Sequence, residues 1–256
     1  MTGKRPRPAE NKMEPEQSLG STNSTTTSPE HFEYFAWLFQ CDSRNRGIIA
    51  QGLDEAALLW KAVKASAGNI LEIGRKRAGS TVLLAAAGKG RSVYSLDLRL
   101  RPNPRCKEYL ETRGGVELRV ANSREALPGI AFGFLFIDGD HSFEGVLADV
   151  LAHWNSLHDI DGRPGLAAFH DALANDNYKW RDSDRKLNRF WIRLKNRLRA
   201  AQKPEIAQDY AEGVNQVCQH LIDRGAAQHW ASASSMLVLR KITDLPDDFS
   251  QSAMSR

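Results

Sequence analysis

Residues 132–137 form an uninterrupted apolar run, Phe-Gly-Phe-Leu-Phe-Ile, and Asp138-Gly139-Asp140-His141 follows it directly. An apolar run of strand length without alternation is typical of a strand buried on both faces of a parallel sheet. In open parallel α/β sheets, ligands bind just beyond the carboxyl ends of the strands. We therefore expect the two carboxylates and the imidazole at this strand end to bind a metal ion or to move a proton.

The chain around this run alternates between strand and helix patterns. We predict strands at residues 69–74, 92–97, 116–120, 132–138, 165–170 and 234–241. We predict helices from His31, at 53–65, 79–87 and 104–113, shortly after Ser123, and at 143–157, 184–201 and 205–223. Because alternating strands and helices indicate βαβ units, the sequence predicts an α/β fold with a doubly wound, mostly parallel sheet and N-terminal helices.

The composition predicts one folded unit with a polar tail. The 256 residues are 41% hydrophobic and 26% charged, which is enough for one sizeable core. Residues 1–30 are rich in Ser, Thr, Pro and charge, and such a segment buries too little apolar surface to offset its ordering entropy. We predict a disordered tail over 1–30, a single domain over 31–245 and a frayed C-terminus over 246–256.

Cysteine usage and charge disfavour several protein classes. Cys41, Cys106 and Cys218 are odd in number and far apart, which disfavours a disulfide scaffold or a structural zinc site and predicts a cytoplasmic, reducing location. No apolar run suits a signal peptide or a membrane span, so we expect no membrane partner. The net charge of +4 is mild, and solubility explains it as well as a polyanionic partner does.

The predicted strand at 69–74 ends in a loop of small and basic residues. Gly74 permits a tight turn and close approach of a ligand to the backbone, and Ser80 or Thr81 can cap the next helix. The loop lacks the GxGxxG pattern of dinucleotide sites and the Gly-Lys-Ser/Thr end of a phosphate loop. Glu72 would also repel a diphosphate. The loop therefore favours a ligand with a positive charge and an amino-acid end, and disfavours a nicotinamide-dependent enzyme.

The pattern Glu72-x-Gly74-x-x-x-Ala78-x-Ser80 resembles the first motif of class I S-adenosylmethionine-dependent methyltransferases, in the branch of metal-dependent small-molecule O-methyltransferases. The resemblance covers most of residues 50–241, and Ala78 stands where that branch usually has Gly. It implies a Rossmann-like class I methyltransferase fold, an enzyme that uses S-adenosyl-L-methionine, and a small-molecule acceptor. The residues that it assigns to the cofactor are Glu72, Gly74, Ala78, Ser80, Thr81, Asp97, Asn122, Ser123 and Asp138.

Polar residues after the second and third strands complete the implied cofactor site. Asp97 matches the acidic residue that family members use to hold the ribose hydroxyls, and Asn122 and Ser123 fall where the family contacts the adenine. The alternative interpretation of Asp97, taken alone, is the N-cap of the next helix. We favour the cofactor interpretation because Glu72 and Asp138 also lie at strand ends.

The fifth predicted strand ends in His170 and Asp171, and adjacent parallel strands would bring these residues beside Asp138. Mg²⁺ needs a few oxygen ligands, and a softer ion such as Mn²⁺, Fe²⁺ or Zn²⁺ would also accept His170. Metal-dependent relatives carry an Asp after strand four and an acidic pair after strand five. The resemblance therefore implies a divalent-metal site of Asp138, His170 and Asp171, with His170 in place of the first acid of the pair.

A hydroxyl acceptor needs a base, because a hydroxyl is a poor nucleophile until its proton is removed. His141 falls where catechol-type relatives place a general-base lysine, and histidine titrates near neutrality. Asp140 falls on the carboxylate assigned as the base in sugar-modifying relatives. We favour His141 over Asp140 as the catalytic base. In the alternative interpretation, residues 138–140 are only a turn, and His141 and Ser142 only begin and cap the next helix.

The basic segment at 184–201 predicts a helix with an apolar stripe. We favour a solvated helix face over a nucleic-acid surface, because the aromatic residues lie on the apolar side. The connection at 172–183, with Tyr178 and Trp180, is a candidate substrate lid because it follows the fifth strand.

These patterns together predict S-adenosylmethionine-dependent methyl transfer to a hydroxyl oxygen of a small molecule, with a divalent metal and a His/Asp general base. We expect no nucleic-acid partner, and a homo-oligomer stays open. The alternative function is a catalytically inactive methyltransferase-like fold that binds nucleic acid or a protein partner through the basic helix.

Overall fold

The structure of the protein is a computed structural model that describes residues 31–40, 47–173 and 210–254. The strands of this part of the chain are β1 (Asn69–Ile73), β2 (Val93–Asp97), β3 (Val116–Val120), β4 (Phe132–Ile137), β5 (Leu166–Phe169), β6 (Ala227–Ala233) and β7 (Met236–Lys241). The α-helices are α1 (Leu53–Ala65), α2 (Gly79–Ala87), α3 (Pro104–Arg113), α4 (Phe143–His153), α7 (Tyr210–Asp223) and α8 (Phe249–Met254). Two 3₁₀ helices are η1 (Phe32–Phe39) and η2 (Trp154–Ser156).

The strands form one seven-stranded sheet in the order β3-β2-β1-β4-β5-β7-β6. Strands β1 to β5 run parallel, whereas β7 runs antiparallel to both β5 and β6. This arrangement confirms the predicted α/β fold with a Rossmann-like, doubly wound, mostly parallel sheet. The strand order reverses between β1 and β4, and ligands of such sheets bind in the crevice at this switch point.

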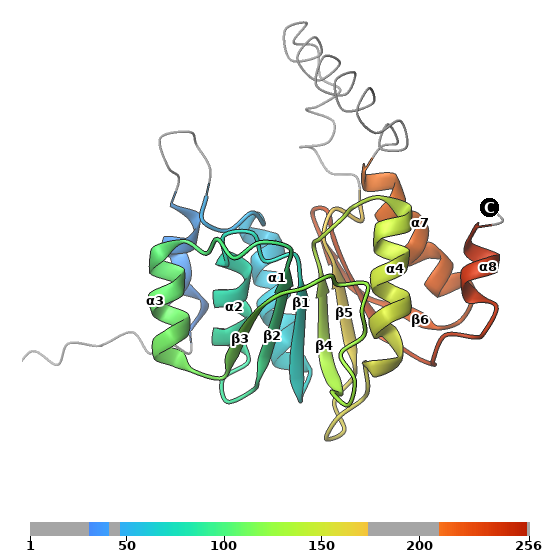
Figure 1. Cartoon of the computed structure of the whole chain (residues 1–256), viewed down its shortest axis with the longest axis horizontal. Helices are drawn as coiled ribbons and strands as arrows, with labels where there is room; N and C mark the ends of the chain where they lie inside the picture. Colours follow the sequence, from blue (N-terminus) through green and yellow to red (C-terminus); the bar gives the residue numbers. More distant parts are fainter. Residues whose placement is uncertain (1–30, 41–46, 174–209, 255–256) are drawn as a thin grey trace, which may run out of the picture.

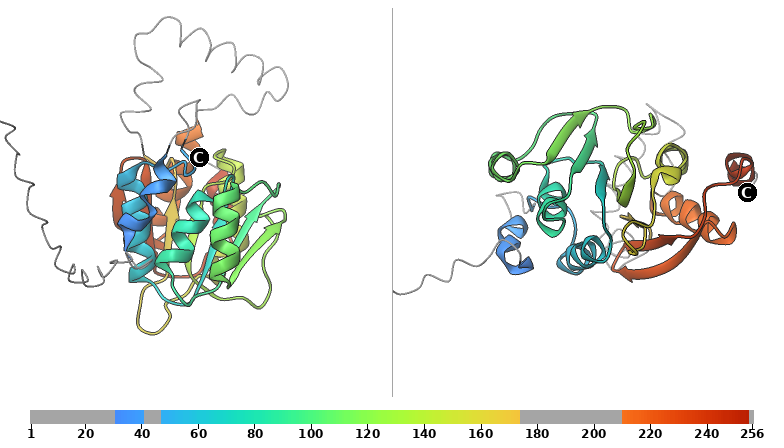
Figure 2. Two further views of the ribbon diagram at one scale, coloured as in Figure 1. Left: turned by 90° about the vertical axis from the view of Figure 1, so that its left-hand side faces the viewer. Right: turned by 90° about the horizontal axis from the view of Figure 1, so that it is seen from below.

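Helices cover both faces of the sheet (Figures 1 and 2). On one face, η1, α1, α2 and α3 share a core cluster with Phe134 and Phe136 of β4. On the other face, α4, α7 and α8 share a core cluster with Leu135 and Ile137 of the same strand. All six residues of β4 are buried, and this explains why the strand shows no polar alternation.

Within the described residues, a loop and an edge strand differ from the sequence prediction. The short helix expected after Ser123 is replaced by turns over residues 121–131, because Pro128 and Gly129 (φ of 74°) stop a helix there. The sequence patterns also miss β6. This strand lies at the sheet edge, pairs only with β7, and consists mostly of small and polar residues, so it lacks the apolar run that marks a buried strand.

The C-terminal segment is helical rather than frayed over residues 249–254. Phe249 is fully buried, and its ring lies 4.6 Å from that of His220 on α7, centroid to centroid. Burial of this ring offsets the entropy cost of ordering the segment. The prediction of a frayed end is therefore wrong for α8.

Several predictions fall on parts of the chain that the structure does not describe. The expected tail (1–30), the basic helix (184–201) and residues 174–183 of the candidate lid lie outside the described residues. Within the described residues, no helix has both the length and the apolar character needed to cross a membrane.

Candidate active site

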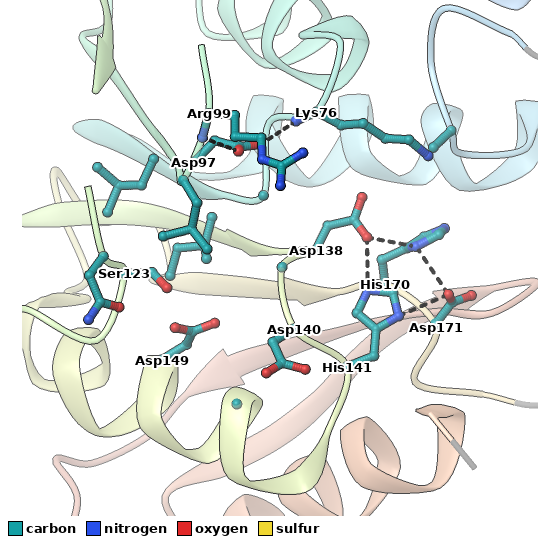
Figure 3. A pocket seen from close by; sticks show the side chains of 18 of the residues that line it. Lys76, Asp97, Arg99, Ser123, Asp138, Asp140, His141, Asp149, His170 and Asp171 are labelled. Atoms are coloured by element: carbon teal, nitrogen blue, oxygen red, sulfur yellow. Dashed lines mark hydrogen bonds and ion pairs between the residues drawn. The ribbon is translucent and has the colours of Figure 1, made fainter. Parts of the chain in front are cut away.

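The carboxyl ends of β1 to β5 surround a cavity of about 1130 Å³. Cofactor and substrate pockets typically measure about 300–1,000 Å³, so a cofactor and an acceptor fit together in this space. Figure 3 shows its polar side chains in two groups. Asp97, Ser123 and Asp149 lie on one side, and Asp138, His141, His170 and Asp171 lie on the other.

Gly74 brings the ends of β1 and β4 into close contact. Its φ is 93°, a conformation that side chains rarely adopt, and a β-carbon there would lie 2.0 Å from the carbonyl oxygen of Asp138. The position therefore accepts only glycine. It lines the cavity with bare backbone, as the sequence predicts for a ligand-binding turn.

Glu72 supports the first loop from behind the cavity wall. Its carboxylate is fully buried and accepts hydrogen bonds from Ser80 Oγ at 2.5 Å, Thr81 Oγ1 at 2.6 Å and Ser95 Oγ at 2.5 Å. Burial raises the pKa of Glu72, although these three hydroxyl groups and Arg75 act in the opposite direction. Glu72 thus fixes the loop through buried hydrogen bonds.

The start of α2 differs from the prediction that Ser80 or Thr81 caps the helix. Its N-cap is Ala78, whose backbone adopts the left-handed conformation with a φ of 69°. The Ala78 side chain makes no capping hydrogen bond. The two hydroxyl groups are committed to Glu72 instead. Among the residues predicted to bind the cofactor, Glu72, Ala78, Ser80 and Thr81 are therefore the ones that do not line the cavity.

Asp97 ends β2 and faces the cavity. Its two carboxylate oxygens accept hydrogen bonds from the backbone N–H of Lys76 at 2.7 Å and of Arg99 at 2.8 Å. The N-cap of α3 is Asn103, whose side chain accepts from the backbone of Arg105. The helix-cap interpretation of Asp97 is therefore wrong, and its remaining lone pairs are available to a ligand.

Asn122 and Ser123 also line the cavity, and the structure adds Asp149 of α4 beside them. The Asp149 side chain is almost fully buried, and burial raises its pKa to about 6 despite a hydrogen bond from Ser123. His153, one turn further along α4, contacts the carbonyl oxygen of Ser123 at 2.7 Å. The only sequence signal for Asp149 is an acidic residue within the apolar face of a helix.

A cluster of titratable side chains surrounds Asp138. His170 Nδ1 lies 3.0 Å and His141 Nε2 lies 3.2 Å from Asp138 Oδ1. The other nitrogen of His141, Nδ1, lies 3.2 Å from Asp171 Oδ2. The adjacent ends of β4 and β5 therefore bring together the four residues that the sequence places at these ends.

Three further residues of the cluster escaped the sequence prediction. Gln51 donates from Nε2 to Asp138 Oδ2 at 2.7 Å. Glu55 of α1 contacts His170 Nε2 at 3.3 Å and accepts from Ser235 Oγ at 2.5 Å. Glu55 also accepts from the backbone N–H of Gly52, as in a capping box. The sequence signal for Glu55 was therefore indistinguishable from that of a helix cap.

The carboxylates of the cluster control the charge of both imidazoles. Burial alone lowers the pKa of a histidine, but hydrogen bonds to Asp138 and Asp171 outweigh it and raise the pKa of His141 to about 9. The charge of Asp138 and the contact with Glu55 likewise outweigh burial and raise the pKa of His170 to about 11. Burial opposes ionisation of Asp138 and Asp171 too, yet the imidazoles hold the pKa of each carboxyl below its usual value.

Asp140 lies outside this cluster. Its carboxylate accepts from the backbone N–H of Ser142 at 3.1 Å and lies 3.8 Å from Arg124. A β-carbon on Gly145 would meet the Asp140 side chain at 2.5 Å, so Asp140 packs against the first turn of α4. Ser142 is the N-cap of that helix, as the alternative interpretation of this segment proposed.

The cluster suits a metal ion. Donor atoms of Asp138, His141 and His170 all lie within 4.8 Å of one another. Ligand atoms about 2.1 Å from an octahedral ion are about 3 Å apart, which matches the distances of 3.0 and 3.2 Å around Asp138 Oδ1. The buried His170 Nδ1 faces Asp138 Oδ1 at 3.0 Å as an ion-pair contact and has no hydrogen-bond partner among the described residues. A nitrogen in these surroundings fits a cation ligand.

The sheet order and the cavity at its switch point define a class I methyltransferase fold, which two solved structures share. The O-methyltransferase TomG from Streptomyces achromogenes, involved in tomaymycin synthesis and solved with S-adenosylmethionine, is 15% identical with a TM-score of 0.51. That match covers 85% of this chain and 90% of TomG. The Podospora anserina methyltransferase PaMTH1, solved with S-adenosylhomocysteine, is 12% identical with a TM-score of 0.51 and coverage of 83% and 87%.

Residues 71–172, which span β1 to the end of β5, match the family described as a methyltransferase domain. This match and the shared fold agree with the class that the motifs imply. No curated protein sequence matches it.

Proposed function

We propose that this protein is a class I methyltransferase that transfers the methyl group of S-adenosylmethionine to a hydroxyl oxygen of a small-molecule acceptor, with the help of a divalent cation. The observation that carries the proposal is one cavity with two chemically different sides. Asp97 lies on the side that suits the cofactor, and the cluster of Asp138, His141, His170 and Asp171 lies on the other. A methyl donor and a metal-bound acceptor would thus meet above the end of β4.

The cofactor side offers a partner for each part of S-adenosylmethionine. Asp97 accepts hydrogen bonds from the ribose hydroxyls, and the bare backbone at Gly74 receives the methionine end. Asn122 and Ser123 contact the adenine. Asp149 accepts a hydrogen bond from the exocyclic amine, because its carboxylate is buried in the same wall and an ionised buried group needs a donor.

The buried residues of the first loop have an indirect role. Glu72, Ser80 and Thr81 form one hydrogen-bonded unit beneath the loop, and Ala78 is the buried N-cap above α2. Their contribution to cofactor binding is to fix the path of the loop. The backbone at Gly74 then needs no conformational change when the cofactor binds.

The transfer breaks the bond between the sulfonium sulfur and the methyl carbon and forms a bond from that carbon to the acceptor oxygen. S-adenosylhomocysteine leaves, and the hydroxyl proton passes to a base on the protein. His141 is the base that the geometry favours, because it belongs to the cluster, whereas Asp140 packs against α4.

Asp138, His170 and Asp171 would hold the cation. When bound, the cation would lower the pKa of a coordinated hydroxyl and offset the carboxylate charge that raises the pKa of His141. The protein contributes a rigid acceptor side: Gln51 fixes one oxygen of Asp138, and Glu55 fixes His170. This rigidity keeps the hydroxyl in line with the methyl group.

Calorimetry with S-adenosylhomocysteine tests the cofactor half of the proposal. We expect binding by the full chain, at least tenfold weaker binding by Asp97→Asn, and no response to NAD. Asp247→Asn, an exposed residue of the loop before α8, is the matched control and should bind normally. Binding of NAD in preference to S-adenosylhomocysteine, or equal affinity of the two variants, would contradict the assignment.

The alternative function, a methyltransferase-like fold that no longer reacts, depends on the basic segment at 184–201. That segment lies outside the described residues. The described cavity keeps a full set of acid, base and ligand side chains, so we retain the enzyme as the proposed function.

A further inference from the structure

Glu55 occupies an unexpected place in the cluster. It belongs to α1, which precedes the sheet, yet its carboxylate contacts Nε2 of His170 at the end of β5, 115 residues further along the chain, at 3.3 Å. The sequence indicates only a helix cap at this position. The contact gives His170 two different surroundings, because Nε2 faces Glu55 and Nδ1 faces Asp138.

The carboxylate of Glu55 is itself held in place. Oε1 accepts from both the backbone N–H of Ser235 at 3.0 Å and its Oγ at 2.5 Å. Oε2 accepts from the backbone N–H of Gly52 at 2.8 Å as well as facing His170. Because hydrogen bonds engage both oxygens, Glu55 cannot turn toward Asp138 without losing them, and it does not act as a ligand itself.

We call the Glu55 carboxylate, held by Ser235 and Gly52 against His170 Nε2, the Glu55 clamp. The clamp determines the orientation of the His170 ring. A carboxylate accepts but does not donate, so it favours the proton on Nε2. A cation that displaced the proton of Nδ1 would meet the lone pair of this nitrogen, which lies 3.0 Å from Asp138 Oδ1 and 3.8 Å from Asp171 Oδ2. Nδ1 is buried and lacks an aligned hydrogen-bond partner among the described residues. Carboxylates that orient metal-bound histidines in this way raise their metal affinity.

The geometry points to a role for Glu55 as a positioning residue that makes His170 a nitrogen ligand, so that the site selects a transition-metal dication over Mg²⁺. This inference rests on the cation of the proposed function and names its chemical class. Imidazole nitrogen suits Mn²⁺, Fe²⁺, Co²⁺ or Zn²⁺, whereas Mg²⁺ prefers oxygen ligands.

The test measures metal binding rather than turnover. The full chain is freed of metal with EDTA and titrated calorimetrically with Co²⁺, Mn²⁺ and Mg²⁺, and Co²⁺ absorption in the visible range reports nitrogen coordination. We expect Co²⁺ and Mn²⁺ to bind at least tenfold more tightly than Mg²⁺. The variant His170→Asp, which replaces nitrogen with oxygen, should lower the Co²⁺ to Mg²⁺ affinity ratio at least tenfold.

Glu55→Gln tests the clamp. We expect a 10- to 100-fold loss of Co²⁺ affinity, the range for loss of such an orienting partner, with unchanged affinity for S-adenosylhomocysteine. At saturating Co²⁺, the visible absorption of Glu55→Gln should differ from that of the parent protein because the His170 ring loses its orientation, and general destabilisation would not produce this change. Ser235→Ala, which removes one donor to Glu55, serves as a milder variant should Glu55→Gln fold poorly. Glu108→Gln, exposed on α3, is the control.

The outcomes separate the inference from the proposed function. Tighter binding of Mg²⁺ than of Co²⁺, or full Co²⁺ affinity in Glu55→Gln, would overturn the inference and leave a metal-assisted transferase in place. Failure of every dication to bind, with S-adenosylhomocysteine still bound, would overturn the inference and the metal in the proposed function together.

Discussion

A β-carbon on Gly74 would lie 2.0 Å from the carbonyl oxygen of Asp138. The two residues end neighbouring strands, since β1 pairs with β4 over residues 69–73 and 132–137. Their contact joins the loop that we assign to the cofactor with the strand end that we assign to the metal. A change at Gly74 therefore acts on both halves of the proposed site.

We expect Gly74→Ala to lose S-adenosylhomocysteine binding and to lower the free energy of unfolding by more than about 2 kcal/mol, because the methyl group must displace the backbone of residue 138. Gly90→Ala is the matched control. Gly90 also has positive φ, 80°, but a β-carbon added there would meet nothing within 4 Å, so only the conformational cost of about 1–2 kcal/mol remains. Equal effects of the two substitutions on cofactor binding, measured calorimetrically, would contradict the close contact between Gly74 and Asp138.

His141→Ala should reduce kcat by about 10²–10⁴-fold, the usual contribution of a general base. The affinity for S-adenosylhomocysteine should change less than threefold, because His141 lies on the acceptor side of the cavity. Asp140→Asn should reduce kcat less than tenfold, since Asp140 lies outside the cluster. Steady-state kinetics with an accepted hydroxyl substrate compare the two variants. A larger loss for Asp140→Asn would reverse the assignment of the base.

Removal of divalent cations should abolish methyl transfer without preventing cofactor binding. The physical reason is that we assign the cation to the acceptor side, whereas Asp97 and Ser123, which we assign to the cofactor, line the other side of the cavity. Turnover is measured after dialysis against EDTA and again after addition of one dication at a time. Full activity in the chelated enzyme would show that His141 and the carboxylates act without a metal.

Asp149 predicts a pH dependence of stability. Burial raises its pKa in the folded protein from 3.8 to about 6, so the folded state holds the proton more tightly than the unfolded chain does. The resulting stabilisation is fully present below pH 3.8 and is lost as the pH rises through 6, a difference of about 3 kcal/mol at most. Asp149→Asn should therefore unfold at higher urea concentration than the parent protein at pH 7.5.

The same substitution should weaken S-adenosylhomocysteine binding about tenfold, because an amide replaces the carboxylate that we assign to the adenine amine. Asp161→Asn, a residue in an exposed turn far from the cavity, should alter neither property. The difference in urea midpoint between Asp149→Asn and the parent protein should be larger at pH 7.5 than at pH 4. An equal difference at both pH values would show that Asp149 is not buried in its charged form.

The sequence determined the parts of this protein that depend on local pattern. The apolar run at 132–137 predicts a fully buried strand, and β4 is buried at all six residues. Helices α1, α2 and α3 begin and end at the predicted residues, because their apolar spacing and boundary residues lie within the same short segments. The acidic residues after the strands mark the edge of the sheet where the cavity lies.

The sequence was less informative about segments without a distinct pattern. β6 consists mostly of small and polar residues, and its partner β7 supplies the apolar strand beside it. Phe249 is a single aromatic residue in a polar segment, and only its burial against α7 explains α8. In both cases a contact distant in the sequence stabilises the element.

Only the tertiary structure decided how the site is supported. Glu55 and Ser235 are 180 residues apart and share a hydrogen bond, and Gln51 reaches Asp138 across 87 residues. The local sequence around each of these residues indicates only a helix cap or a turn. It therefore does not reveal that the residue supports the site. The strand ends specify which side chains face the cavity, whereas the orientation of each side chain depends on partners that folding brings from distant parts of the chain.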